Sequence, residues 1–227
     1  MIRFGHPAGT ASTHPQFGER YMHAFRFGIL LPMLGLLGGC TSVSSNYEGE
    51  ITKAHASRII VCHGHDCARK ERLDITPADA EKFTAIMARG AASAKGERQA
   101  VSAAVQYFEE RSAQLIGVRD KGKSQVGPMQ QPGQMDCIDE STNTRSLLLH
   151  LEKRGLLKHH KVEGNIARGF LFDARFPHAT AVLRDKTGTQ WAVDSWEKDA
   201  GAPPEIILLE HWVGNGGLGE VLGGRTT

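Results

Sequence analysis

The sequence is short of cysteine, of an excess of either charge and of long apolar runs. Its 4 cysteines in 227 residues are too few for a small fold built on disulfides. Lys and Arg total 27 against 25 Asp and Glu, so no basic excess marks a nucleic-acid partner. The main apolar run covers only residues 27–39, whereas a membrane-spanning helix needs about 20 apolar residues. These absences exclude a disulfide miniprotein and a multi-span membrane protein, and 40% apolar residues fit an ordinary globular chain.

The apolar run at 27–39 has the order typical of a secretory signal peptide. Two arginines precede it, the run is uncharged, and small residues end it. The segment Leu-Gly-Gly-Cys at 37–40 resembles the bacterial lipobox, in which the cysteine is diacylated and becomes the mature N-terminus. The resemblance implies a signal peptide over residues 1–39 and a lipid on Cys40. A plain signal peptide, or a buried apolar segment with an incidental cysteine, is the alternative.

An export signal changes how the first part of the chain is interpreted. Lipoproteins usually start a few residues before the apolar run. Met22 is therefore a candidate for the true start of the protein, and residues 1–21 would then come from a wrongly assigned start. Without residues 1–39, the 27 basic and 25 acidic residues fall to 24 of each, so the mature chain is neutral. Membrane attachment is then expected from the lipid rather than from a basic patch. Thr41 resembles an outer-membrane sorting signal, and residues 40–58 are the expected lipidated end and tether.

Residues 59–213 predict one α+β domain, in which helices pack on a small antiparallel sheet. Thr76, Pro77 and Asp79 have the spacing of an N-cap, a first helical residue and a reciprocal acidic cap. Apolar positions recur with helical spacing in three stretches, and strand signals dominate later. One predicted helix begins at Pro77, a second covers 97–115, and a third follows Cys137 and ends at Gly155. The predicted strands are 59–61, 169–172, 179–184, 190–194 and 206–209. A polar loop is expected over 118–136, and a flexible Gly-rich tail over 214–227.

The cysteines beyond Cys40 fall into a close pair and one isolated residue. Cys62 and Cys67 can close a short loop, and an oxidising compartment favours a disulfide between them. The rival interpretation is a zinc or copper site, because the segment CHGHDC at 62–67 offers thiols, imidazoles and a carboxylate. Its spacing matches no common structural zinc pattern, so we expect a disulfide, no resident metal and no cofactor. Cys137 is then left unpaired as a candidate reactive thiol.

Cys137 lies at a predicted helix start, where the helix dipole and unpaired backbone N–H groups favour a thiolate. Neighbouring acidic residues oppose this effect, so a histidine is needed beside the thiol. His178 opens the predicted strand 179–184, and a turn at 185–188 returns the chain to a strand that ends at Asp194. The midpoint of 178 and 194 falls inside that turn, so we expect the two residues to lie opposite each other within one residue of register. The order Cys, His, Asp then matches nucleophile, base and orienter.

This arrangement resembles the transglutaminase-like branch of the papain-like cysteine enzymes, which includes bacterial cysteine peptidases. The segments GQMDCIDESTNT, PHATAVL and WAVDSW also look like those of a family of uncharacterised proteobacterial lipoproteins. The likeness covers about residues 60–213. It implies a transglutaminase-like core with Cys137 as nucleophile, His178 as general base and acid, and Asp194 as orienter. The candidates for the oxyanion-hole glutamine of papain-like enzymes are Gln131 and Gln134.

The sequence therefore predicts a lipid-anchored thiol hydrolase of the cell envelope, in the outer membrane and facing the periplasm. As a peptidase or amidase, its thiol would attack an amide carbonyl, form a thioester and be released by water. As an acyltransferase, it would pass the acyl group of the thioester to an amine. A peptide, a protein or a peptidoglycan peptide is the expected substrate. The alternative is a non-catalytic envelope lipoprotein that uses the same fold as a binding or scaffold module, because each of the three residues alone has common structural roles. A metal-binding lipoprotein based on residues 62–67 is a third hypothesis.

Overall fold

The computed structural model describes residues 57–123, 131–169 and 177–214, which form a mixture of helices and antiparallel sheets. The elements are β1 (Arg58–His63), β2 (Arg69–Asp74), α2 (Pro77–Ala88), α3 (Ala94–Ile116), α4 (Cys137–Lys153), β3 (His160–Val162), β4 (Ile166–Arg168), β5 (His178–Asp185), β6 (Gln190–Asp194), β7 (Glu205–Leu208) and α5 (Leu209–Gly214). The predicted α+β class is confirmed. The predicted signal, the lipobox cysteine and the Gly-rich tail beyond 214 lie outside the described residues. None of the described helices is both long and apolar enough to cross a membrane.

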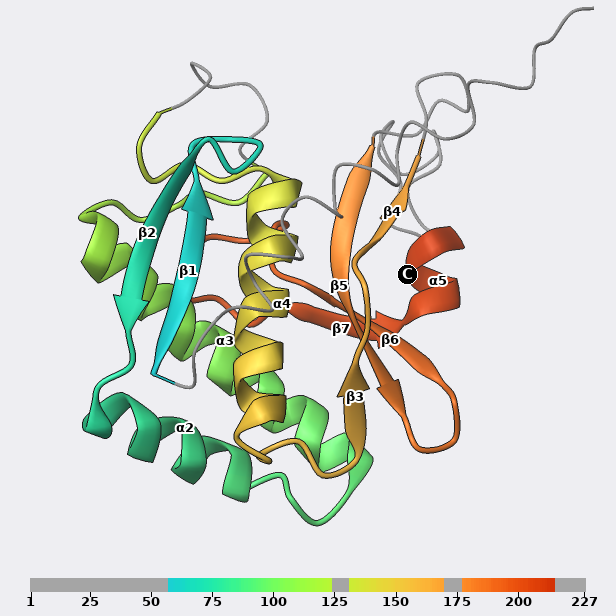
Figure 1. Cartoon of the computed structure of the whole chain (residues 1–227). Coiled ribbons are helices and arrows are strands. Elements are labelled where there is room, and N and C mark those ends of the chain that lie inside the picture. Colours follow the sequence, from blue (N-terminus) through green and yellow to red (C-terminus); the bar gives the residue numbers. More distant parts are fainter. Residues whose placement is uncertain (1–56, 124–130, 170–176, 215–227) are drawn as a thin grey trace, which may run out of the picture. The chain divides into compact units, whose positions relative to one another are not determined.

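Helix α4 packs on two separate sheets (Figure 1). It contacts β1, which forms an antiparallel hairpin with β2, and it contacts β5 and β6 of a larger antiparallel sheet. The larger sheet has the order β3-β5-β6-β7, with β4 also paired to β5. Leu147, Leu148 and Leu151 of α4 are fully buried, at the spacing of a core-facing helical stripe. The prediction of a single small sheet is therefore incomplete, because the β1–β2 hairpin forms a second one.

Capping residues set the bounds of α2 and α3. The Thr76 side chain accepts from the Asp79 N–H at 3.1 Å, and the Asp79 side chain accepts from the Thr76 N–H at 3.0 Å, which confirms the predicted capping box. Helix α3 begins before its predicted start because Ser93 caps the Gly96 N–H at 3.0 Å. It ends at Ile116, one residue beyond the predicted 115, and its C-cap Gly117 has a left-handed φ of 81°.

Sequence patterns do not predict β2, β3, β4 or α5. Strand β2 reads RKERLD with only Leu73 buried, so no apolar alternation marks it, and it forms by pairing with the buried strand β1. The predicted strand at 169–172 is wrong at Gly169, which follows β4, and its remaining residues lie outside the described part of the chain. The predicted strand at 206–209 loses Leu209 to α5. The strand 190–194 is confirmed at both ends.

Candidate active site at the start of helix α4

Helix α4 begins at Cys137, as the sequence predicts, and Asp136 is its N-cap. The Asp136 side chain accepts from the N–H groups of Ile138 at 3.0 Å and Asp139 at 2.8 Å. The Asp139 side chain in turn accepts from the Asp136 N–H at 3.3 Å. This capping box satisfies backbone donors at the helix start with two carboxylates. Cys137 therefore occupies the first helical residue, with an acidic residue immediately before it and another two residues after it.

Cys62 and Cys67 form the predicted disulfide, with their Cα atoms 4.7 Å apart, and it closes the loop between β1 and β2. Among the described residues Cys137 is the free cysteine. Ligand atoms of Cys62, Cys67 and Asp139 lie within 4.8 Å of one another, which is the outline of a metal-binding group. Metals bind thiolates, however, and a disulfide offers none. These residues therefore do not fit a metal in the oxidised form.

The β5–β6 hairpin brings His178 and Asp194 together, but in a register that differs from the predicted one. Ala181 pairs with Val193, so the continuing register places Asp194 opposite Thr180 instead of His178. The predicted direct opposition is wrong by two residues. A shift of two residues keeps both side chains on one face of the sheet, and diagonal neighbours remain within reach of long side chains. The contact forms along this diagonal, with His178 Nε2 2.5 Å from Asp194 Oδ2.

Asp194 has a second side-chain donor, which the sequence does not predict. The Nε1–H of Trp212, on α5, donates to Asp194 Oδ2 at 2.7 Å, and this tryptophan is fully buried. The His178 ring packs against Trp212 and Trp196, with centroid distances of 5.3 and 4.6 Å. A buried tryptophan needs a partner for its N–H, and this requirement is the signal that could have singled out Trp212. The His178–Asp194 pair is thus buried beside two aromatic rings.

In the neutral form of His178, an Nε2–H that donates to Asp194 leaves Nδ1 as the acceptor. Nδ1 is buried and has no hydrogen-bond partner among the described residues. Cys137 Sγ lies against the backbone on either side of this histidine, 3.9 Å from Pro177 O and near the Ala179 N–H. The described chain contains no hydrogen bond between the thiol and His178. The two groups are therefore neighbours that are not joined in this structure.

Burial raises the pKa of Cys137 to about 11, and the carboxylates of Asp136 and Asp194 act in the same direction. The Ala179 N–H opposes this effect by stabilising the thiolate. The expected lowering by the helix dipole is therefore outweighed by burial, which the sequence did not reveal, and by the acidic neighbours, which it did. The resting group is a neutral thiol.

No family model, no curated protein and no solved structure matches the chain. A histidine held by a buried carboxylate, next to a thiol at a helix start, can accept the proton of that thiol during nucleophilic attack.

The two glutamines proposed for the oxyanion hole differ in their surroundings. The Gln134 side chain donates to Arg119 O at 3.4 Å, and its backbone oxygen accepts from the Gly64 N–H at 2.7 Å. Gln131 lies exposed on the surface. The amide of Gln134 is thus used to hold the polar loop. Gln131 is the better candidate for a group that meets a ligand, although it makes no hydrogen bond to Cys137 within the described residues.

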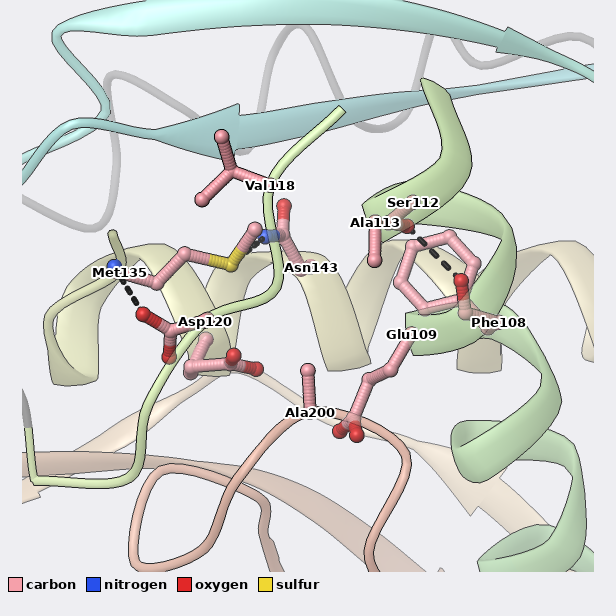
Figure 2. A pocket seen from close by; sticks show the side chains of 10 residues that line it. Phe108, Glu109, Ser112, Ala113, Val118, Asp120, Met135, Asn143 and Ala200 are labelled. Atoms are coloured by element: carbon pink, nitrogen blue, oxygen red, sulfur yellow. Dashed lines mark hydrogen bonds between the residues drawn. The ribbon is translucent and has the colours of Figure 1, made fainter. Parts of the chain in front are cut away.

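Three buried carboxyls surround a small cavity beside α4 (Figure 2). Glu109 of α3, Asp120 of the following loop and Glu140 of α4 line a space of about 10 Å³, which is room for about one water molecule. Burial raises their pKa values to about 9, 7 and 8, and repulsion from nearby carboxylates adds to the effect. Ser195 donates to Glu140 at 2.8 Å. Glu140 therefore connects helix α4 to the residue that follows β6.

Proposed function

We propose that this chain is a thiol hydrolase with Cys137 as nucleophile, His178 as general base and Asp194 as orienter. The observation that carries the proposal is the buried His178 ring, whose Nε2 lies 2.5 Å from Asp194 Oδ2 while Nδ1 has no partner among the described residues. A buried polar atom without a partner costs about 1–3 kcal/mol. Transient bonding of Nδ1 to a thiol proton, or to a substrate, would offset that cost.

The reaction that we propose is acyl transfer at an amide or ester carbonyl. Cys137 Sγ bonds to the carbonyl carbon, its proton passes to His178 Nδ1, and the carbonyl π electrons move to oxygen. The tetrahedral intermediate collapses to a thioester, and the leaving amine takes the proton from His178. Water then attacks the thioester with His178 as base, the acid leaves, and the thiol is restored. Because the resting group is a neutral thiol, proton transfer accompanies the attack, as it does in serine-type triads.

Two features would stabilise the charges that develop in this reaction. The backbone N–H of Cys137 lies at a helix start, where it can donate to the oxyanion. Asp194 stabilises the imidazolium that forms on His178, and the donor from Trp212 at 2.7 Å fixes the orientation of the carboxylate. Gln131 is the side chain that we propose as a further oxyanion donor.

We also propose a transglutaminase-like core and a lipid anchor. Support for the core is the arrangement of the cysteine at the start of α4 with the histidine on β5 and the aspartate on β6. Support for the anchor is the apolar run at 27–39 followed by Cys40. The enzyme would then face the periplasm from the outer membrane and act on a peptide, a protein or a peptidoglycan peptide. Cells fed an alkyne-tagged fatty acid should label the wild-type chain but not Cys40→Ser, and equal labelling of both would contradict the anchor.

A non-catalytic binding module is the second candidate. It is favoured by the pKa of the Cys137 thiol, which burial raises to about 11, and by the lack of a described bond between this thiol and His178. In this case the histidine and aspartate would hold β5 and β6 to α5 and would have no chemical role.

Acylation by p-nitrophenyl acetate separates the two candidates. The hydrolase should release a burst of p-nitrophenolate and carry an acetyl group on Cys137, identified by peptide mass spectrometry. Cys137→Ala should abolish the burst, and His178→Gln should slow it by about 10²–10⁴-fold. The exposed His211 offers a matched control, and His211→Gln should leave the burst unchanged. Equal rates of Cys137 acetylation in the wild type and in His178→Gln would refute the hydrolase and favour the binding module.

A further inference from the structure

The loop closed by the Cys62–Cys67 disulfide has a left-handed backbone at four consecutive residues. Gly64 has a φ of 83°, and the φ angles of His65, Asp66 and Cys67 are 66°, 52° and 51°. This region is costly for residues other than glycine, and it persists where the surroundings hold the chain in place. Successive backbone N–H groups of a tight turn can point to one side and bind an anionic group.

The N–H groups of this loop bind the two carboxylates that cap α4. The His65 N–H donates to Asp139 Oδ2 at 2.8 Å, and the Cys67 N–H donates to Asp139 Oδ1 at 2.7 Å. The Asp66 N–H donates to Asp136 Oδ2 at 2.9 Å. Both oxygens of Asp139 are thus held by the loop. The disulfide loop therefore contacts the carboxylates on both sides of the proposed nucleophile.

Further contacts attach the loop to α4 and to the segment before it. The Asn143 side chain accepts from the Cys62 N–H at 2.7 Å and donates to Cys62 O at 2.8 Å. The Gly64 N–H donates to Gln134 O at 2.7 Å. The disulfide joins the two ends of the strained turn. If it opens, the turn can relax, and its N–H groups can leave the carboxylates.

The charge near the Cys137 thiol depends on these donors. The carboxylates that act on the thiol are Asp136, from the cap of α4, and Asp194, from β6, and both raise its pKa. His178 lies on β5, which packs against α4, and the thiol contacts the backbone of the residues on either side of it. Burial raises the pKa of Asp139 to about 8, whereas the N–H groups of the loop lower it by stabilising the ionised form. The carboxylate that matters for the thiol is Asp136: deprived of the Asp66 N–H that faces it, it would repel a thiolate more strongly. Asp139 deprived of its donors would bind a proton more readily, so it adds nothing to this repulsion.

We infer that the 62–67 loop is a positioning element for Cys137, which holds the carboxylates of Asp136 and Asp139 by backbone N–H donors so that the thiol can ionise during attack. The inference rests on the proposed hydrolase, in which Cys137 is the nucleophile. Because the loop depends on a disulfide, the reactivity of the thiol should follow its redox state. A phosphine and one water molecule convert the disulfide into two thiols and a phosphine oxide, with both electrons supplied by phosphorus.

The test is the rate of iodoacetamide alkylation at Cys137 in the full chain at pH 8, followed by peptide mass spectrometry. Two forms with an open loop are compared with the wild type: the double variant Cys62→Ser/Cys67→Ser, and wild type treated with phosphine. Both should alkylate about tenfold more slowly, which is the change in thiolate population for one pKa unit. Asp74→Asn, which removes an exposed carboxylate at the far end of the hairpin, should match the wild type.

A rate within twofold of the wild type, or a faster rate, in both open forms would overturn the inference. If circular dichroism shows that the double variant is unfolded, the phosphine-treated chain decides alone. At pH values below the thiol pKa, the alkylation rate should rise tenfold per pH unit in all forms. The whole pH profile of the open forms should be displaced toward alkaline pH. A loop with a purely structural role would leave the profile in place. The two proposals can be refuted independently. A wild type that releases no burst from the ester would contradict the hydrolase, whereas an alkylation profile that is not displaced would contradict only the positioning role.

Discussion

Trp212 and Trp196 allow the hydrogen bond to Asp194 to be separated from aromatic packing. Both are buried against the His178 ring, at 0% and 5% exposure, but of their two indole N–H groups only that of Trp212 donates to Asp194. The Trp196 backbone N–H donates to Asp194 Oδ1 at 3.3 Å, and this bond does not depend on the side chain. The Trp196 Nε1 has no partner among the described residues. Tryptophan to phenylalanine removes the same atoms from each site, and the Arg168 guanidinium, 4.2 Å from the Trp212 ring, still has an aromatic ring to stack on in the variant. Trp212→Phe also removes a hydrogen bond to a charged group, worth about 1.5–3 kcal/mol, whereas Trp196→Phe removes an unsatisfied donor.

We therefore expect Trp212→Phe to lose at least about 1.5 kcal/mol more free energy of unfolding than Trp196→Phe. Urea unfolding of the full chain at pH 7 measures this difference, provided that the slope of free energy against urea is the same in both variants. Trp212→Phe should also slow p-nitrophenyl acetate acylation, because Asp194 loses the group that orients it. Equal losses of stability in the two variants would show that the indole N–H contributes nothing and would refute the reasoning.

Three further predictions concern buried ionisable groups. Burial lowers the pKa of His150 to about 4, so the free energy of unfolding of the wild type should fall by up to about 3 kcal/mol as pH falls from 6.5 to 4. Urea titrations of His150→Leu should not show this loss. Burial raises the pKa of Glu109 to about 9, so stability should fall as pH rises from 4.5 toward 9, and Glu109→Gln should flatten this dependence. Glu97, fully buried, accepts from the backbone N–H groups of His159 and His160 at 3.0 Å, so Glu97→Gln should cost at least about 2 kcal/mol by urea unfolding; a cost below 0.5 kcal/mol would contradict this role.

The hairpin shows how far the sequence leads and where it stops. The apolar runs and the glycine predict β5, the turn and β6, and they do so because alternation and turn chemistry are local. The register depends on a side chain: Asp185 Oδ1 accepts from the N–H groups of Thr187 at 2.9 Å and Thr189 at 3.1 Å. These bonds centre the turn one residue later than the midpoint argument assumes. The resulting shift of two residues leaves both side chains on the same face of the sheet. The predicted contact between His178 and Asp194 is therefore present although the predicted register is wrong.

The acidity of Cys137 could not be predicted in the same way. Helix position and acidic neighbours can be read from the sequence, but burial is a property of the folded chain, and here it is the largest cause of the raised pKa. The role of Trp212 is hidden for the same reason, since α5 meets β6 only after the sheet has formed. The capping box of α4, by contrast, depends on residues three apart and is predictable from sequence alone.

A thiol with a pKa of about 11 makes two kinds of reaction at Cys137 respond differently to pH. Alkylation by iodoacetamide needs the thiolate, which is about one molecule in 10⁴ at pH 7, so its rate should rise tenfold per pH unit through pH 9. Ester acylation in the proposed mechanism takes the proton through His178 during attack, so its rate should rise less steeply over the same range. His178→Gln should remove the difference and give both reactions the tenfold slope. Parallel tenfold slopes in the wild type would mean that the histidine accepts no proton from the thiol, and the site would then be better explained as structural.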